Sequence, residues 1–295
     1  MSDQRILNVP VVFADRFYMF QKALNEIARL GGYTVAVDSG DLAEKIGSSA
    51  VRVIVSEYVP LNDAVLKQAP ALKGVIAYGA GYDHIDVEAM RRKGVMVCNC
   101  RGQNAQAVAE LTFGLLLCLL RKIHKTDPWI RAGEWEKVGR ALPEWTSGRE
   151  LWRKTLGVIG FGQIGARVVR IAKGFDMRVI GYDPFTNPDH YCRLGVEPVA
   201  LAELISLSDV VTLHLPLTPD TGKMIDSRML AGAKPGMILV NTSRGKVVDE
   251  EALIDALQTG RIGGAVLDVF SAEPLPSGNP LAAMDNVVLS PPWGP

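Results

Sequence analysis

The sequence has no excess of charge of either sign. Its 295 residues include 32 lysines and arginines and 32 aspartates and glutamates, so the formal net charge is zero. Binding to nucleic acid or to an anionic membrane surface favours a basic stripe or patch, and the sequence has none. We therefore expect a small molecule as the ligand, with no nucleic acid and no membrane among the partners.

Cysteine is also scarce. The four cysteines form no CxxC pair, the spacing typical of cysteine zinc sites and redox centres, so we expect no metal site. Cys98 and Cys100 would share one face of a strand, where residues two apart are badly placed for a disulfide. We expect buried free thiols, which favour a reducing compartment.

Long hydrophobic runs are absent as well. The longest apolar run, residues 111–120, is too short to cross a bilayer. Residues 1–5 do not lead into the apolar core of a signal peptide, which together with the free thiols predicts a cytoplasmic protein. The hydrophobic content of 48% is enough to build a large core in one or two domains.

Short β-branched runs alternate with amphipathic stretches, and this alternation occurs in two series. In the first series the expected strands are 6–13, 33–37, 51–55, 72–77 and 95–98. The helices expected there are 17–30, 61–68 and 87–92. In the second series the expected strands are 155–160, 177–182, 210–215, 237–241, 264–268 and 287–290. Strands that are apolar on both faces and alternate with helices favour parallel sheets in an α/β fold.

Two segments separate the series. Residues 103–123 are rich in alanine and leucine and contain no proline, so they predict one long helix that could bridge two domains. Residues 127–149 combine tryptophan, glycine and charge without clear periodicity. We expect a mostly irregular connector there, with its tryptophans as packing anchors.

A glycine motif opens the second series. Residues 160–165, Gly-Phe-Gly-Gln-Ile-Gly, fit G-x-G-x-x-G, follow an expected strand and precede an expected helix at 164–173. Gly160 would permit a tight turn, Gly162 would let backbone amides approach a pyrophosphate, and Gly165 would let helix and strand pack closely. The helix N-terminus would attract the anion.

Asp183 ends the next expected strand, 18 residues beyond Gly165. Its carboxylate would accept hydrogen bonds from the hydroxyls of the adenosine ribose, and its charge would repel a 2′-phosphate. The pattern therefore predicts NAD rather than NADP as the cofactor. The alternative is a glycine-rich turn with a surface aspartate, which the strand and helix around the motif disfavour.

Three polar residues stand at the carboxyl ends of later strands, the edge where open parallel sheets bind ligands. His214 ends one expected strand, Arg244 follows another, and Asp268 ends a third. On position alone, each is more often a solvated or capping residue than a catalyst.

At this point the residues resemble a family, the D-isomer-specific 2-hydroxyacid dehydrogenases, which includes glyoxylate, hydroxypyruvate and D-3-phosphoglycerate dehydrogenases. The resemblance covers nearly the whole chain. It is carried by the glycine motif with Asp183 and by five further segments, Gly79–Asp86, Asn104–Glu110, Leu213–Thr218, Asn241–Gly245 and Asp268–Pro274.

The resemblance implies a Rossmann-type doubly wound parallel sheet for NAD and a smaller flavodoxin-like α/β substrate domain. Residues 1–99 would form the substrate domain and 100–290 the Rossmann domain, with a long crossover helix at 100–124. Residues 291–295 would start a segment that returns to the substrate domain. The family also implies a homodimer in which the helix at 103–123 contributes apolar residues; a helix buried within one subunit is the alternative.

The resemblance also assigns roles to residues. Arg244 would bind the substrate carboxylate and the C2 oxygen, because its planar guanidinium can hold both and can stabilise charge growing on that oxygen. Asp268 would hold the nicotinamide carboxamide. The substrate carboxylate would also meet backbone amides in a segment that would otherwise be an ordinary turn, Tyr78, Gly79, Ala80 and Gly81. Further cofactor contacts would come from Val108, Gln163, Ile164, His214, Pro216, Thr242 and Ser243, and again from Arg244.

One departure from the family concerns the proton at C2, which family members move with a catalytic glutamate and histidine. Glu273 matches the glutamate, but Pro292 occupies the place of the histidine, and the four histidines stand elsewhere, at His84, His124, His190 and His214. The family also continues with a further helix beyond Pro295. We expect NADH binding with slow turnover of glyoxylate or hydroxypyruvate, because a lost general acid costs about a hundredfold to ten-thousandfold in rate. A non-catalytic NAD(H)-binding sensor or scaffold is the alternative.

Overall fold

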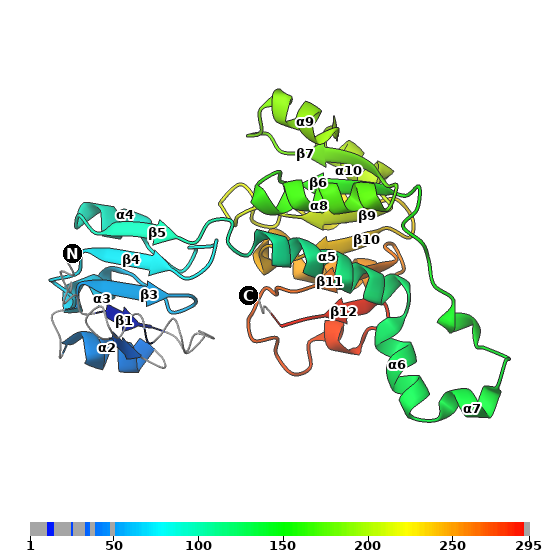
Figure 1. The fold of residues 1–295 in the computed structure, drawn as a ribbon, viewed down its shortest axis with the longest axis horizontal. Coiled ribbons are helices and arrows are strands. Elements are labelled where there is room, and N and C mark those ends of the chain that lie inside the picture. The colour runs from blue at the N-terminus through cyan, green and yellow to red at the C-terminus, as the bar shows by residue number, and fades with distance from the viewer. Residues whose placement is uncertain (1–10, 15–24, 26–32, 36–38, 48–50, 292–295) are drawn as a thin grey trace, which may run out of the picture. The chain divides into compact units, whose positions relative to one another are not determined.

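The computed structural model describes residues 11–14, 25, 33–35, 39–47 and 51–291. By its internal contacts the chain divides into an N-terminal unit, residues 1–104, and a C-terminal unit, residues 105–295. Each unit has its own parallel sheet (Figure 1). The prediction of an α/β fold with two parallel sheets is confirmed.

The N-terminal unit contains five parallel strands in the order β2-β1-β3-β4-β5. The strands are β1 (Val11–Phe13), β2 (Tyr33–Val35), β3 (Val53–Ser56), β4 (Gly74–Ala77) and β5 (Met96–Asn99). The helices are α2 (Ser39–Gly47), α3 (Asp63–Gln68) and α4 (Val87–Arg92). Side-chain oxygens of Asn62 and Asp86 cap α3 and α4, so both helices begin where their sequences place an N-cap residue. The strand order is that of a flavodoxin-like sheet.

The first helix expected in this unit, residues 17–30, lies outside the described residues except for residue 25. Residues 6–10 of the first expected strand also lie outside them. Helix α2 was not expected. It carries Leu42 and Ile46, which are almost fully buried in the core of this unit.

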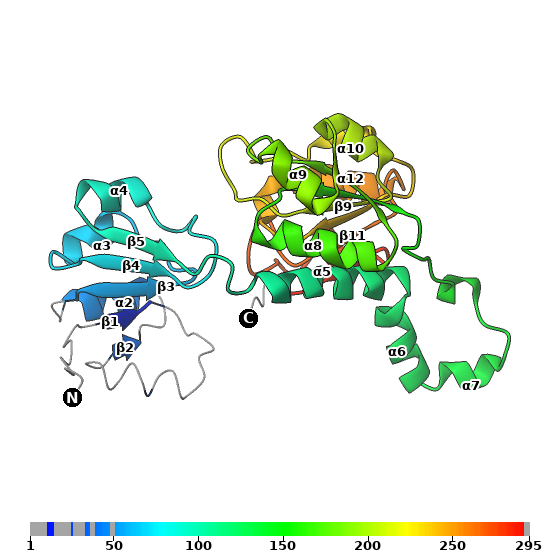
Figure 2. The same cartoon turned by 45° about the horizontal axis from the view of Figure 1, so that its top comes forward.

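The C-terminal unit contains seven parallel strands in the order β12-β11-β10-β9-β6-β7-β8 (Figure 2). The strands are β6 (Thr155–Ile159), β7 (Arg178–Tyr182), β8 (Glu197–Pro198), β9 (Val210–Leu213), β10 (Ile238–Asn241), β11 (Gly264–Leu267) and β12 (Val287–Leu289). The chain builds the sheet outward from β6 through β7 to β8 and then returns to β9 on the other side of β6. The sheet is therefore doubly wound, with its switch point between β6 and β9.

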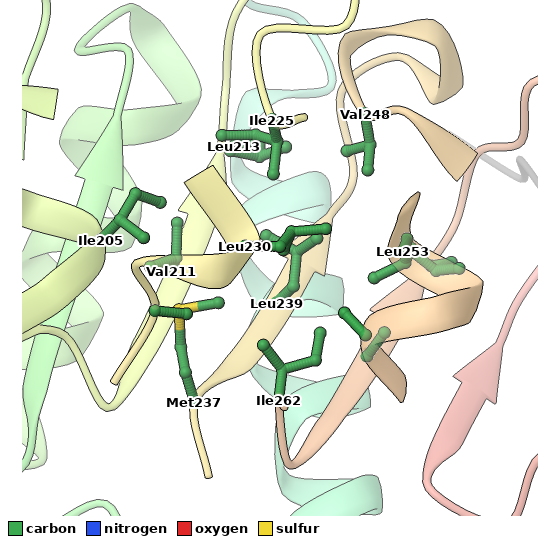
Figure 3. Packing of buried hydrophobic residues seen from close by; sticks show 14 of the residues in the cluster. Ile205, Val211, Leu213, Ile225, Leu230, Met237, Leu239, Val248, Leu253 and Ile262 are labelled. Carbon is green, nitrogen blue, oxygen red and sulfur yellow. The ribbon is translucent and has the colours of Figure 1, made fainter. Parts of the chain in front are cut away.

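Helices cover both faces of this sheet (Figures 1 and 2). They are α5 (Ala105–Leu120), α8 (Gln163–Gly174), α9 (Pro188–Leu194), α10 (Leu201–Leu207), α11 (Ser227–Ala231) and α12 (Glu250–Gln258), with short 3-10 turns η2 (Gly245–Val247) and η3 (Pro280–Ala283). Alternate strand residues enter opposite cores. Val211 and Leu239 pack with α10 and α11 residues in one core (Figure 3), whereas Val210 and Val240 belong to the core that includes α5 and α8 residues.

Helix α5 is buried within the C-terminal unit. Half of its residues are buried, among them Phe113 and Leu116, and the ring of Phe113 stacks on that of Phe175 with 5.4 Å between centroids. The helix ends before Lys122, which has a left-handed backbone with φ of 59°. One face of α5 therefore packs in the core of its own unit.

The expectation of an irregular connector after α5 was wrong. The chain forms α6 (Ile123–Arg131), α7 (Glu134–Val138) and the 3-10 turn η1 (Glu144–Thr146), and both helices extend away from the sheet (Figures 1 and 2). We call residues 123–147 the arm. The indole rings of Trp129 and Trp145 pack edge to face with 5.6 Å between centroids. Several large apolar side chains in or beside the arm are exposed, namely Ile123, Ile130, Trp135, Leu142, Trp145 and Trp152.

All four cysteines are free thiols. The expectation that they are buried was wrong, because each is at least partly exposed. Cys98 and Cys192 are exposed, and Cys100 and Cys118 are partly exposed. Cys98 lies on β5, the edge strand of its sheet. Within the described part of the chain, no helix has both the length and the apolar character needed to cross a membrane.

Candidate functional site

The carboxyl ends of six strands of the C-terminal unit lie in one row. Strand pairing aligns the last residues of these strands, Tyr182, Ile159, Leu213, Asn241, Leu267 and Leu289. The residues that follow them come to one edge of the sheet and are Asp183, Gly160, His214, Thr242, Asp268 and Ser290. This row therefore gathers the candidate residues that the sequence placed at strand ends.

The glycine turn between β6 and α8 requires glycine at two positions. Gly160 has φ of 93°, in the left-handed region that favours glycine, and a Cβ there would overlap the His214 carbonyl oxygen. A Cβ at Gly165 would overlap the Gly160 carbonyl oxygen. At Gly162, the N-cap of α8, a Cβ would meet no heavy atom within 4 Å. The chain therefore packs tightly behind the turn and leaves open space in front of the helix N-terminus.

Asp183 is tied to this turn. Its Oδ2 accepts hydrogen bonds from the Phe161 backbone N–H at 2.9 Å and from the Thr186 hydroxyl at 2.9 Å. Its Oδ1 accepts from the Phe185 N–H at 3.0 Å, and its backbone carbonyl accepts from the Tyr191 hydroxyl at 3.1 Å. The carboxylate is held in place beside the glycine turn and is partly open to solvent.

His214 is buried at the switch point. Its Nε2 lies 2.9 Å from the Thr212 hydroxyl, while Nδ1 is buried without a hydrogen-bond partner. Burial lowers the pKa of this imidazole to about 3. His214 is therefore neutral at neutral pH and can present one unused ring nitrogen to a ligand.

Asp268 is a buried acid with an unused oxygen. The side chain is 6% exposed, and Oδ1 has no hydrogen-bond partner. The pKa of the carboxyl is raised to about 6, chiefly by burial; a hydrogen bond from Ser290 opposes this rise, and the nearby charge of Glu273 adds to it. Buried polar atoms are nearly always paired, so this oxygen marks a place for a hydrogen-bond donor from a ligand.

Glu273 lies on the loop that follows Asp268. Its Oε1 accepts a hydrogen bond from the Phe270 backbone N–H at 2.8 Å, and the residue as a whole is exposed. Glu250 holds the same loop, because its two oxygens accept from the Ser271 N–H at 3.0 Å and from Asn279 Nδ2 at 2.9 Å. The loop that carries Glu273 is therefore fixed from α12.

Arg244 lies on the loop after β10, and Asn241 organises that loop. Asn241 Oδ1 accepts from the Ser243 N–H at 3.1 Å and from its hydroxyl at 2.9 Å, while Nδ2 donates to the Arg244 carbonyl at 2.9 Å. The Arg244 guanidinium donates to the Ser243 carbonyl at 2.7 Å. Gly245 follows, and a Cβ there would overlap the carbonyl of Phe270, so the two loops lie in close contact.

Four further candidates for cofactor contact differ in exposure. Val108 is buried on α5, and its carbonyl accepts from the Thr112 hydroxyl at 2.8 Å. Gln163 is exposed and Ile164 partly exposed in the first turn of α8. Pro216 is exposed, and its carbonyl accepts from the Thr221 hydroxyl at 2.7 Å.

Residues 78–81 belong to the N-terminal unit and directly follow β4. The Tyr78 N–H donates to the Ser56 carbonyl at 2.8 Å and the Gly79 N–H to the Ala77 carbonyl at 3.0 Å. The Ala80 carbonyl accepts from Asn99 Nδ2 at 2.7 Å. Burial raises the pKa of the Tyr78 hydroxyl, as do nearby Glu57 and Cys100. The amides of Ala80 and Gly81 make no backbone hydrogen bond within the described residues.

Sequence reasoning missed the residues that hold these loops in position. Asn241, Thr112 and Glu250 touch the site loops through side-chain hydrogen bonds, and none was a candidate. The one available signal was Asn241 at the end of a strand of otherwise apolar residues. An amide that is buried there must be hydrogen-bonded to the loop that follows.

The residues present fit a bound dinucleotide. Open space in front of Gly162 leaves room for a pyrophosphate at the N-terminus of α8, where backbone amides and the helix dipole favour an anion. The Asp183 carboxylate stands at the end of the neighbouring strand, where a ribose would lie. The unused Oδ1 of Asp268 can accept from an amide group.

Comparison with known proteins agrees with this geometry. Residues 113–294 match the family model described as D-isomer specific 2-hydroxyacid dehydrogenase, NAD binding domain. The chain is 44% identical over 232 residues to a glyoxylate reductase of Korarchaeum cryptofilum, which covers 79% of this chain and 69% of that protein. It is 40% identical over 279 residues to a D-3-phosphoglycerate dehydrogenase of Methanocaldococcus jannaschii, covering 94% of this chain and 52% of the relative.

Among solved structures, a glyoxylate reductase from Paecilomyes thermophila superposes with a TM-score of 0.84 at 28% identity, covering 97% of this chain and 88% of that one. Sequence and structure thus agree on both the family and the cofactor. The chain belongs to the D-isomer specific 2-hydroxyacid dehydrogenases, which are NAD-dependent enzymes, and residues 113–294 match their NAD-binding domain.

Proposed function

We propose that this chain transfers a hydride between NAD(H) and C2 of a small 2-oxo or D-2-hydroxy acid, with glyoxylate and hydroxypyruvate as the first substrates to test. The names of its relatives, glyoxylate reductase and D-3-phosphoglycerate dehydrogenase, support a two-carbon or three-carbon acid. The observation that carries the proposal is the single edge that holds the glycine turn, the buried acceptor of Asp268 and the loop with Arg244.

The cofactor would be held by the C-terminal unit. The amides around Gly162 would bind the pyrophosphate, Asp183 the adenosine ribose, and Asp268 the carboxamide of the nicotinamide. Contacts along the rest of its length would come from Val108, Gln163, Ile164, His214, Pro216, Thr242 and Ser243. Bound NADH supplies the hydride, and this is all the chemistry that the cofactor contributes.

Arg244 would bind the substrate carboxylate and the C2 oxygen. Its guanidinium forms a planar fork with a permanent charge, so it can stabilise negative charge that develops on the oxygen. In the N-terminal unit, the amides of Ala80 and Gly81 are the donors that we propose for the carboxylate, because those of Tyr78 and Gly79 already donate to Ser56 and Ala77.

We propose that proton transfer is the weak step of the chain as written. Glu273 can orient or polarise a proton donor, but Pro292, where the family has its histidine, has no group that titrates. Residue 292 lies outside the described residues. The same substitution motivates a second candidate function, an NAD(H)-binding sensor or scaffold that retains the pocket without turnover.

We further propose a homodimer in the cytoplasm. The exposed apolar side chains of the arm, among them Ile130 and Trp135, support a contact between two copies better than α5, whose buried face packs in its own unit. Exposed free thiols such as Cys98 and Cys192 are typical of a reducing compartment.

The test of the proposed function follows NADH absorbance with a panel of 2-oxo acids. Turnover that is strongest with glyoxylate or hydroxypyruvate supports the enzyme, and NADH binding without turnover of any acid supports the sensor. The Arg244→Ala variant should keep NADH binding and lose about a hundredfold or more in rate. Lys246→Ala, which removes an exposed positive charge from the same loop, is the matched control. Full activity of Arg244→Ala would contradict the proposed role.

A further inference from the structure

The loop that carries Arg244 is linked to helix α5 through two buried hydroxyl groups. Thr112 on α5 is 2% exposed, and Thr242, the first residue of the loop, is 7% exposed. Their Oγ1 atoms lie 3.1 Å apart, although the residues are 130 positions apart in the chain. Thr112 Oγ1 also lies 2.8 Å from the Val108 carbonyl oxygen, one turn earlier in α5.

This arrangement determines the direction of each hydrogen bond. A hydroxyl has one proton, and the Val108 carbonyl can only accept, so the proton of Thr112 is donated to Val108. The bond between the two threonines then requires Thr242 to donate to Thr112. Thr112 is therefore the acceptor that holds the Thr242 hydroxyl in a buried position.

Hydrogen bonds between neighbouring residues give the loop its shape. Asn241 bonds Ser243 and the Arg244 carbonyl, and the Arg244 guanidinium bonds the Ser243 carbonyl. These bonds join residues within the loop, and backbone bonds from Asp268 and Lys223 to the Asn241 and Lys246 carbonyls flank it. The bond to Thr112 ties the loop to a long helix whose buried face packs in the core of the domain.

We propose that Thr112 is a positioning residue, which orients Arg244 toward the substrate through the hydroxyl of Thr242. The proposal rests on the proposed function of Arg244. Without an acceptor at position 112, the buried donor of Thr242 loses its partner, and an unsatisfied buried donor is costly. The loop should relieve that cost by moving, and Arg244 would move with it.

The roles of donor and acceptor make the two threonines unequal. Thr112→Val removes the acceptor and leaves the Thr242 donor buried and unpaired. Thr242→Val leaves Thr112 with its bond to Val108, so no donor loses its partner. The double variant removes both hydroxyls together and should therefore be less disturbed than Thr112→Val alone.

The experiment compares Thr112→Val, Thr112→Ser, Thr242→Val and the double variant in the full chain. Thr126→Val is the matched control, because the Thr126 hydroxyl also donates to a carbonyl four residues earlier, at 3.0 Å from that of Lys122, but on the arm. Hydrogen exchange of the amides of residues 243–245 reports the loop directly. Oxamate binding in the presence of NADH reports the substrate site, and NADH binding alone reports the cofactor site.

Thr112→Val should speed exchange in the loop about tenfold and weaken oxamate binding by a similar factor. NADH affinity should fall less, by about threefold, because most of the proposed cofactor contacts lie outside this loop. For any 2-oxo acid that the chain reduces, Thr112→Val should lower kcat by a larger factor than it raises KM. Thr112→Ser should restore all of these values to within about twofold. In loop exchange and in oxamate affinity, the double variant should differ less from the unmodified chain than Thr112→Val does.

Loop exchange in Thr112→Val that matches Thr126→Val would overturn the proposal, as would a double variant more disturbed than Thr112→Val. If oxamate binds to no form of the chain, the proposed function fails. The exchange data would still decide whether Thr112 positions the loop, so the two failures can be told apart.

Discussion

The backbone N–H of Phe161 donates a hydrogen bond to Oδ2 of Asp183 at 2.9 Å. The bond joins the glycine turn after β6 to the end of β7, so the residue that would select the cofactor also holds the turn that would bind its phosphates. If Asp183 selects the cofactor as proposed, cofactor selectivity and the geometry of the turn are coupled through this bond.

The first prediction concerns this coupling. Asp183→Ala should weaken NADH binding about tenfold or more, because it removes the acceptor for the ribose hydroxyls and the support of the Phe161 amide. NADPH should lose less, since the repulsion of its 2′-phosphate disappears at the same time. Titration of both cofactors by fluorescence measures the change. Asp189→Ala, an exposed acid in α9, is the control, and an equal loss of both cofactors would argue against Asp183 as the selector.

A second prediction concerns the packing behind the turn. Gly165→Ala should destabilise the protein by about 1–3 kcal/mol, because its Cβ would overlap the Gly160 carbonyl. Gly174→Ala in the same helix is the control, since a Cβ there meets no heavy atom within 4 Å. Urea unfolding compares the two variants. Equal stabilities would mean that the turn can shift away from the helix without cost.

Sequence reasoning succeeded where one short segment determines its own structure. The G-x-G-x-x-G motif, β7 ending just before Asp183 and the helix that follows the motif were each predicted to within a residue or two. These features are local. Buried runs of β-branched residues define the strands. A position whose backbone conformation only glycine adopts readily defines the turn.

It failed where the periodic pattern is weak and where structure depends on distant partners. The arm was expected to be irregular, because tryptophan, glycine and charge obscure its periodicity, yet it forms two helices in which no residue is buried. The hydrogen bond between Thr112 and Thr242 joins residues 130 apart. No periodicity or spacing in a single sequence signals such a pair, because threonine is common in both helices and loops.

Asp268 gives a prediction about pH. Burial raises the pKa of its carboxyl to about 6, above the ordinary 3.8. The folded state therefore holds this proton more tightly than the unfolded state, and the resulting stability is complete below about pH 4 and lost as the pH rises through 6. Asp268→Asn should add about 1–2 kcal/mol at pH 7.5, less than the full shift implies, because the amide group of asparagine is a buried donor that needs a partner of its own.

The gain from Asp268→Asn should shrink toward zero near pH 4, where the native carboxyl is also neutral. Urea unfolding of the variant and of the unmodified chain at both pH values gives the difference between their free energies of unfolding. Titration of other groups such as His214 affects both chains equally and cancels in this difference. Asp220→Asn, an exposed acid, should show no such trend. A gain that stays constant with pH would mean that Asp268 is not the group responsible.

The arm supplies a prediction about assembly. Ile130→Glu and Trp135→Glu should each convert a homodimer to monomers, because a buried unpaired charge in an apolar contact is costly. Light scattering measures the mass. Met96→Glu is the control. Met96 is an apolar residue on β5 that is 69% exposed, and its replacement should leave the dimer intact. Dimers that survive both arm substitutions would place the contact between copies elsewhere.

The proton step can be tested by restoring the missing group. Pro292→His introduces an imidazole where the family has one, and Glu273 is present to orient it. A positioned general acid contributes about a hundredfold to ten-thousandfold, so glyoxylate reduction should rise by up to that factor and acquire a dependence on pH near 6 to 7. Pro292→Asn, which is polar but does not titrate in this range, is the control.

The outcomes separate three cases. If the unmodified chain already reduces glyoxylate at a high rate, and Pro292→His and Pro292→Asn do so at the same rate, another residue donates the proton. If all three bind NADH but none turns over, the sensor or scaffold is favoured over the enzyme.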